Sequence, residues 1–98
     1  MRTMLKISIP VTTGNKTIQD GSLPRVMQTA LETLKPEAAY FFPDSGKRTA
    51  LMVFDLKEPS QIPLVVEPLF IGLDADIQLI PVMNAQELQA GLGQLAKK

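Results

Sequence analysis

The chain has 98 residues, of which 45% are hydrophobic and 20% charged, and its ten basic and ten acidic residues cancel. This composition is typical of one globular domain, residues 1–98, whose modest core a partner subunit would help to stabilise. The balanced charge argues against nucleic-acid binding, because a phosphate backbone is bound by concentrated positive charge.

The chain contains no His and no Cys. Their absence excludes thiolate zinc sites, iron–sulfur clusters and disulfides, and it removes the commonest general base and haem ligand. We therefore expect no metal and no cofactor. No stretch approaches the roughly 18 apolar residues of a membrane span, and the N-terminus lacks the apolar run of a signal peptide. We expect a cytoplasmic protein that does not bind membranes.

The first predicted element is a strand over Thr3–Val11, because its residues alternate between two faces. One face carries only apolar residues: Leu5, Ile7, Ile9 and Val11. The polar segment Thr12–Gly21 is predicted to be a loop, with at most a short helical turn around Lys16–Gln19.

A helix is predicted to begin at Ser22, a favoured N-cap residue, and to end before Pro36. Its apolar residues recur at helical spacing: Leu23, Val26, Met27, Ala30, Leu31 and Leu34. This stripe is typical of a helix that packs one face against the rest of a domain.

The segment Glu37–Lys57 predicts a β-hairpin, because the apolar runs Ala38–Phe42 and Thr49–Leu56 flank a turn sequence that contains a glycine. If the loop is Asp44–Lys47, cross-strand partners sort the side chains onto two faces. One face then carries Ala39, Phe41, Ala50, Met52 and Phe54, and the other carries Tyr40, Phe42, Thr49, Leu51, Val53 and Asp55. A loop that differs by one residue would exchange these assignments on one strand.

A second helix is predicted over Ile62–Leu73, with a kink at Pro68 because a proline removes a hydrogen bond from the helix interior. Ala75–Met83 is predicted to be the last strand. Asn84 is a favoured N-cap for a final helix that runs through Leu95.

The order β-α-β-β-α-β with a C-terminal helix predicts an α+β fold of the ferredoxin-like type, a four-stranded antiparallel sheet with helices on one face. The helices are expected to cover Leu5, Ile7, Ile9, Phe41, Met52 and Phe54. The opposite face would still carry Met4, Tyr40, Phe42, Leu51, Val53 and Ile80. At roughly 25 cal/mol per Å², leaving these side chains in water would forgo several kcal/mol. We therefore expect a homodimer, in which a second copy covers this face across a two-fold axis.

This order, the chain length and the doubly apolar sheet resemble the dimeric α+β-barrel superfamily, in which two ferredoxin-like sheets pack face to face. Within it, Lys35–Phe41, Asp44–Arg48 and Pro59–Pro63 resemble a small bacterial family that has no assigned activity. The resemblance extends from about Met4 to Met83. Members of the superfamily include muconolactone isomerases, antibiotic-biosynthesis monooxygenases and small haem-degrading enzymes. The haem-degrading members need an axial His, and the others commonly use His or Trp, which this chain lacks.

Five polar residues are candidates for ligand binding: Lys6, Tyr40, Asp55, Glu67 and Gln78. Lys6 and Asp55, on strands expected to be adjacent, would form either an acid–base pair or an ion pair that fixes the dimer register. Tyr40, with Gln78 as a candidate neighbour, would either donate a hydrogen bond to a ligand or only pack its ring. Glu67 precedes the predicted kink and is either an acid–base group or a solvated side chain.

These features predict a homodimeric ferredoxin-like domain that binds a small molecule or acts as an interaction module. The resemblance implies an alternative, a cofactor-independent oxygenase or isomerase that acts on a small apolar or aromatic substrate. Such an enzyme would need a closed cavity of about 300 Å³ or more, reached by the polar candidates. A third possibility is a subunit of a larger complex, which would leave a hydrophobic patch exposed in the homodimer.

Overall fold

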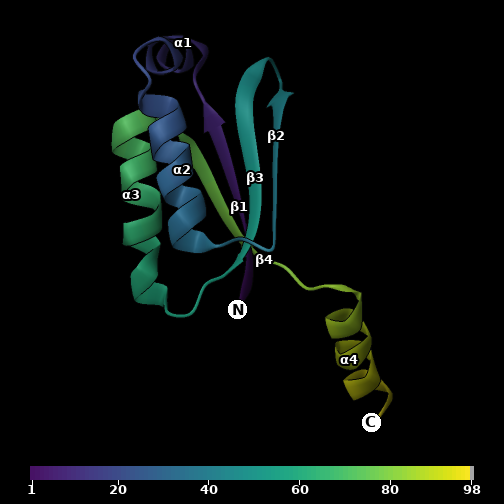
Figure 1. The fold of residues 1–98 in the computed structure, drawn as a ribbon. Coiled ribbons are helices and arrows are strands. Elements are labelled where there is room, and N and C mark those ends of the chain that lie inside the picture. The colour runs from purple at the N-terminus through teal and green to yellow at the C-terminus, as the bar shows by residue number, and fades with distance from the viewer. Residues whose placement is uncertain (98) are drawn as a thin grey trace.

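The computed structural model describes residues 1–97, which form four α-helices, a short 3-10 helix and a four-stranded antiparallel sheet (Figure 1). The strands are β1 (Arg2–Ile9), β2 (Ala38–Asp44), β3 (Lys47–Asp55) and β4 (Asp76–Pro81). The helices are α1 (Val11–Gln19), α2 (Ser22–Leu34), α3 (Ile62–Leu73) and α4 (Ala85–Ala96), and the 3-10 helix η1 (Pro59–Gln61) precedes α3. The predicted α+β class and antiparallel sheet are confirmed.

The strands lie in the order β2-β3-β1-β4, so β3 and β1 are central and β2 and β4 are the edges. Helices α2 and α3 lie side by side over one face of the sheet (Figure 1). The core between these layers includes Leu5, Ile7, Ile9, Met27, Met52, Phe54, Leu69 and Leu73. In the described part of the chain the other face, here called the open face, has no helix over it. Its large apolar residues are the predicted ones: Met4, Tyr40, Phe42, Leu51, Val53 and Ile80.

The hairpin between β2 and β3 has the predicted register, with Tyr40 opposite Leu51. Pairing continues as far as Asp44 and Lys47, so the turn itself is only Ser45–Gly46. Both turn residues have positive φ, 55° and 77°, which is what a type I′ turn requires. The predicted loop was one residue too long on each side of the turn. The cross-strand partners are therefore the predicted ones, and the assignment of side chains to faces is confirmed.

The prediction of a loop at Thr12–Gly21 is wrong, because most of this segment is helix α1. The carbonyl of Pro10 accepts a hydrogen bond from the N–H of Gly14 at 2.8 Å, which closes the first helical turn. Gly14 and Thr17 are buried, and a Cβ atom on Gly14 would lie 2.7 Å from Nη1 of Arg48. Packing against the domain therefore outweighs the low helix propensity of the Thr, Gly and Asn residues in this segment.

The prediction that the helices cover Phe41 is also wrong, since its side chain is 56% exposed. Phe41 lies on the helix-bearing face but on the edge strand β2, beside α2 rather than beneath it. It lines an apolar groove of about 360 Å³ together with Leu23 and Met27 of α2.

The bounds of α3 match the predicted helix, and Pro68 lies within it. Strand β4 is shorter at both ends than the predicted Ala75–Met83. Asn84 caps α4 as predicted, because its side chain accepts a hydrogen bond from the N–H of Glu87 at 2.8 Å. The kink at Pro68 stays a prediction.

Candidate functional site

The open face is arranged in rows that cross all four strands. The middle row consists of Tyr40, Leu51, Lys6 and Gln78, one residue from each strand in the order β2, β3, β1, β4. Three of the five predicted site residues thus share one row. Strands lie about 4.8 Å apart, which places the backbones of Tyr40 and Gln78 roughly 14 Å apart. They are therefore not direct neighbours, and Leu51 and Lys6 lie between them.

The rows on either side differ in polarity. Ala38, Val53, Met4 and Ile80 form one row, and Phe42, Thr49, Ser8 and Asp76 form the other. The first row is entirely apolar, whereas the second contains two hydroxyl groups and a carboxylate and lies toward the hairpin turn. The open face therefore combines an apolar half with a more polar half, and Tyr40, which is 63% exposed, stands on the edge strand between them.

Lys6 forms its ion pair with Asp44 and not, as predicted, with Asp55. Its Nζ lies 2.8 Å from Oδ2 of Asp44, at the end of β2, so the side chain spans the intervening strand β3. The hydrogen bond from Lys6, together with its positive charge, lowers the pKa of Asp44. The partner that the sequence reasoning missed is Asp44, which was predicted to lie in the hairpin loop and instead ends β2, paired with Lys47.

Around this ion pair the open face is hollowed to a volume of about 170 Å³. The hollow is lined by Lys6, Ser8, Asp44, Ser45, Lys47, Asp76 and Gln78. Two lysines and two aspartates balance one another in charge, and the hydroxyl and amide groups supply further donors and acceptors. The lining therefore suits an uncharged polar group better than an anion or a cation.

Asp55 lies at the opposite end of the open face. The N-terminal ammonium of Met1 donates a hydrogen bond to its Oδ1 at 2.6 Å, and this contact lowers the pKa of the carboxyl group. Asp55 also lines a hollow of about 460 Å³ with Lys57 and Leu64, at the end of the sheet. It does not join Lys6 in one site.

Glu67 lies on the other side of the molecule, exposed on α3. Helix α3 packs against the helix-bearing face of the sheet, so Glu67 and the open face are separated by the sheet itself. The structure thus brings together Lys6, Tyr40 and Gln78 of the predicted candidates and separates Asp55 and Glu67 from them.

A scan against models of known protein families finds no match for this chain, and a search of curated proteins finds none either. The candidate site therefore rests on geometry and chemistry alone.

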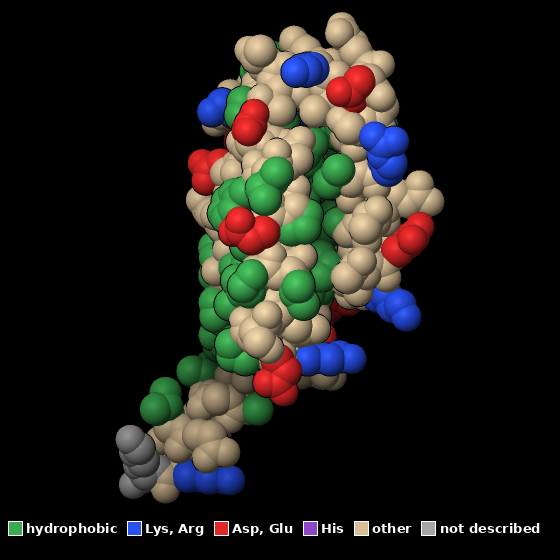
Figure 2. All heavy atoms as spheres, turned by 90° about the vertical axis from the view of Figure 1, so that its left-hand side faces the viewer, with side chains coloured by type: hydrophobic (Ala, Val, Ile, Leu, Met, Phe, Trp, Pro, Cys, Tyr) green, Lys and Arg blue, Asp and Glu red, His purple; other side chains and the backbone are tan. Residues whose placement is uncertain are grey.

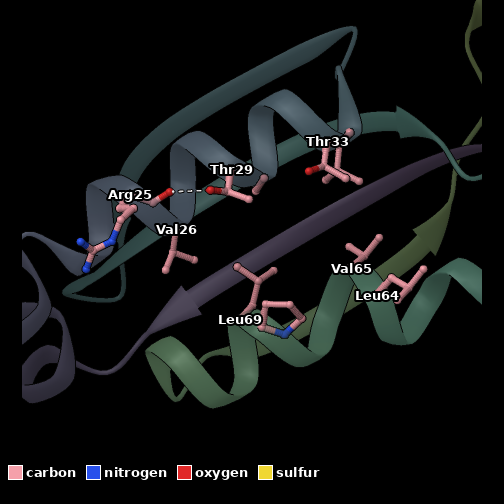
Figure 3. Close-up of a pocket in the computed structure, with 10 residues that line it drawn as sticks. Arg25, Val26, Thr29, Thr33, Leu64, Val65 and Leu69 are labelled. Carbon is pink, nitrogen blue, oxygen red and sulfur yellow. Dashed lines mark hydrogen bonds between the residues drawn. The ribbon is translucent and has the colours of Figure 1, made fainter.

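Another hollow lies in the helix layer, between α2 and α3 (Figure 3). It has a volume of about 180 Å³, and Val26 and Leu69 point toward each other across it. Its lining is mainly apolar, with Arg25 and Thr29 near one end, where the Thr29 hydroxyl donates a hydrogen bond to the Arg25 carbonyl at 3.0 Å. None of the five predicted site residues lines this hollow.

Among residues 1–97, no group of three or more Asp and Glu side chains is placed to hold a metal ion. The same part of the chain contains no helix with the length and apolar character needed to cross a bilayer.

Proposed function

We propose that this protein is a homodimer whose two open faces pack against each other and enclose a site for a small, uncharged, largely apolar molecule. The observation that carries the proposal is the uncovered face of the sheet, with its large apolar side chains and its polar hollow. The proposed dimer is of the α+β-barrel kind. This part of the proposal follows from the resemblance to that superfamily, which rests on the element order and on the doubly apolar sheet.

The apolar half of the open face supports a covered surface. Six large apolar side chains lie on it, and burying apolar area stabilises by roughly 25 cal/mol per Å², which amounts to several kcal/mol for such a set. The largest apolar patch on a typical soluble monomer is about 300–600 Å² and is often functional, so a patch of this kind favours an interaction surface. A second copy is the simplest cover, because a two-fold axis presents the same surface twice.

The polar half supports a ligand site. Binding sites combine mostly apolar walls with a few polar groups that orient the ligand, and the hollow around Lys6 lies on the same face as the apolar row. The hollow is balanced in charge, so the favoured ligand is neutral, with one polar group near Lys6 and Gln78. Its apolar part would lie toward Leu51 and Tyr40.

The alternative, a cofactor-independent oxygenase or isomerase, has less support. Such reactions need a general base with a pKa near the working pH. The two carboxyl groups on the open face that have shifted pKa values, Asp44 and Asp55, are both shifted downward, which makes them weaker bases. Binding is therefore the better-supported function.

A second candidate, a subunit of a larger complex, is favoured by the outer surface of α3. Hydrophobic side chains gather over the helix layer (Figure 2), and Leu64 and Ile71 of α3 are 76% and 79% exposed. Apart from Glu67, every residue of this helix is apolar or glycine. A helix that is apolar all round is normally buried, and a dimer formed through the open faces would leave this surface exposed.

Native mass spectrometry of the purified protein tests the proposal. We expect a dimer, and we expect Leu51→Glu to shift it to a monomer, because the substitution places a charge at the centre of the proposed interface. The monomer should still fold, since the new carboxylate would lie on the open face beside the ammonium group of Lys6. Leu64→Glu is the matched control, since it places the same charge on the exposed helix layer and should leave the dimer intact. A wild-type monomer, or a dimer that survives Leu51→Glu, would contradict the proposal.

Tyr40 offers a specific probe of the ligand site, because the chain has a single tyrosine and no tryptophan. Its fluorescence therefore reports on the open face alone. We expect small neutral aromatic compounds to change Tyr40 emission in the wild-type dimer and to raise its thermal stability. The Leu51→Glu monomer should lose both responses, whereas equal responses in the monomer would place the ligand elsewhere.

A further inference from the structure

Helix α4 stands apart from the rest of the molecule (Figure 1). In the described chain it has no buried residue, and Leu88, Leu92 and Leu95 are all exposed, Leu95 by 62%. Met83, in the segment that leads into the helix, is exposed as well. A well-capped helix that presents its leucines to solvent indicates a surface that another molecule covers.

The sequence of α4 specifies a helix that docks through one narrow stripe. Ala85, Leu88, Leu92 and Leu95 follow a 3-4-3 spacing, which aligns them along one side of the helix. The rest of α4 is Gln, Glu, Gly or Ala, so this stripe is its only set of large apolar side chains. Isolated helices of about 12 residues are marginal in water, and most helical stability in proteins comes from packing an apolar face.

The position of α4 is set by Arg2, at the end of the open face. Arg2 pairs across the sheet with Asp55 and shares the open side with Met4. Its guanidinium donates hydrogen bonds to Oε1 of Glu37 at 2.6 Å and to Oε1 of Glu87 in the first turn of α4. Glu87 is therefore bound on the open side of the sheet, and α4 leaves the domain next to the surface that the second copy is proposed to cover.

The open face alone is small for a stable dimer. With strands about 4.8 Å apart and alternate residues about 6.7 Å apart, its three rows span roughly 19 Å by 20 Å, or about 400 Å² per copy. Two such faces would bury roughly 800 Å², whereas stable specific interfaces bury about 1,200–2,000 Å². An α-helix of 12 residues is about 18 Å long and about 10 Å wide. Two α4 helices and the surfaces that they cover would add roughly 700 Å², which brings the total into the range of stable dimers.

We infer that α4 is a dimer clasp: in each subunit its leucine stripe packs against the second copy of this chain. The inference rests on the proposed homodimer and adds the element that completes the interface. Because a two-fold dimer is reciprocal, each copy both donates a clasp and receives one. A substitution in the stripe therefore acts twice in each dimer.

The test measures the dimer dissociation constant by sedimentation velocity over a range of protein concentrations. We expect Leu92→Glu to weaken the dimer by at least about tenfold, because it places a charge in the middle of the stripe on both helices. Ala90→Glu is the matched control, since residue 90 lies on the opposite side of α4, and it should leave the dissociation constant within about twofold of the wild type.

A second measurement locates the helix directly. The chain has no cysteine, so Gln94→Cys carries a single nitroxide spin label on α4. In mixed dimers of one spin-labelled subunit and one ¹⁵N-labelled subunit, the clasp predicts line broadening in the ¹⁵N spectrum, because the spin label lies against the partner. A second sample carries both labels on the same chain, Gln94→Cys, diluted into unlabelled wild type. Broadening seen only in this second sample would mean that α4 folds back on its own subunit and would overturn the inference.

The outcomes separate this inference from the proposed function. A wild-type dimer that Leu51→Glu dissociates but Leu92→Glu leaves unchanged keeps the open-face dimer and overturns the clasp, leaving the leucine stripe to a different partner. A dimer weakened by both variants, and by neither Ala90→Glu nor Leu64→Glu, supports both. A wild-type monomer overturns both.

Discussion

At the scale of single residues, the Lys6–Asp44 ion pair is the feature of the candidate site that solution chemistry can test most directly. Lys6 holds the pKa of Asp44 below its ordinary value, so the folded chain binds a proton there less readily than the unfolded chain. The pair therefore contributes its full stability at pH values above the pKa of an aspartate in the unfolded chain, about 3.9. This stability is lost as the pH falls through the lower pKa that Asp44 has in the folded chain. Both side chains are partly exposed, so the contribution is small.

We predict that Asp44→Asn lowers the urea midpoint slightly at pH 7 and that the difference from wild type shrinks as the pH falls through the lowered pKa of Asp44. Once the wild-type carboxyl is protonated, neither protein has the ion pair. Asp76→Asn is the control, since Asp76 lines the same hollow but forms no ion pair within residues 1–97. A difference between wild type and Asp44→Asn that persists in acid would mean that Asp44 contributes through hydrogen bonds rather than charge.

The missed partner of Lys6 shows where residue-level prediction fails. The sequence places Lys6 on the open face because alternation along β1 is unambiguous. It does not say which carboxylate a long, flexible side chain will reach, and Lys6 spans β3 to contact Asp44. Asp55 was the expected partner from strand adjacency, but the N-terminal ammonium occupies it.

At the scale of elements, the hairpin turn is the most clearly specified local structure. Ser45 and Gly46 both have positive φ, and the glycine adopts it without strain, whereas a serine there has a cost. Asn is better suited to this conformation, and Asn-Gly is the preferred pair for a type I′ turn. Since strained left-handed residues cost of order 1–3 kcal/mol, Ser45→Asn should relieve part of that strain.

We predict that Ser45→Asn raises the free energy of unfolding by a few tenths to about 1 kcal/mol, measured by urea denaturation. Ser45→Val should lower it, because a β-branched residue is disfavoured at positive φ. Equal effects of the two substitutions would show that the turn does not adopt the type I′ conformation.

Helix α1 shows the limit of prediction at the same scale. Its residues have low helix propensity, and the segment has the composition of a loop. The helix forms because Gly14 allows Arg48 to pack closely and because Thr17 is buried against the domain. Those contacts depend on residues far apart in the sequence, which a local pattern does not contain.

At the scale of the whole molecule, the sequence patterns predict the layers and the faces well. Alternation in the strands and helical spacing in α2 correctly assign the buried face and the open face, because both follow from the geometry of regular elements. It is harder to predict which apolar side chains the other elements of the fold will cover. Phe41 is exposed because β2 is an edge strand, and α4 projects from the domain with no buried residue (Figure 1); both depend on how elements are placed in space.

The proposed dimer has a consequence for the stability of the whole molecule. If unfolding separates two chains, the folded state is favoured by mass action, and each tenfold rise in protein concentration adds about 1.4 kcal/mol to the stability of the dimer. For a dimer of this total length, we predict that the thermal midpoint rises by about 3–6 °C for each tenfold increase in concentration. The Leu51→Glu variant should unfold at a midpoint independent of concentration, since a monomer gains nothing from mass action. Calorimetry on both proteins over a hundredfold range of concentration checks this, and a constant wild-type midpoint would mean that the open face is not a subunit interface.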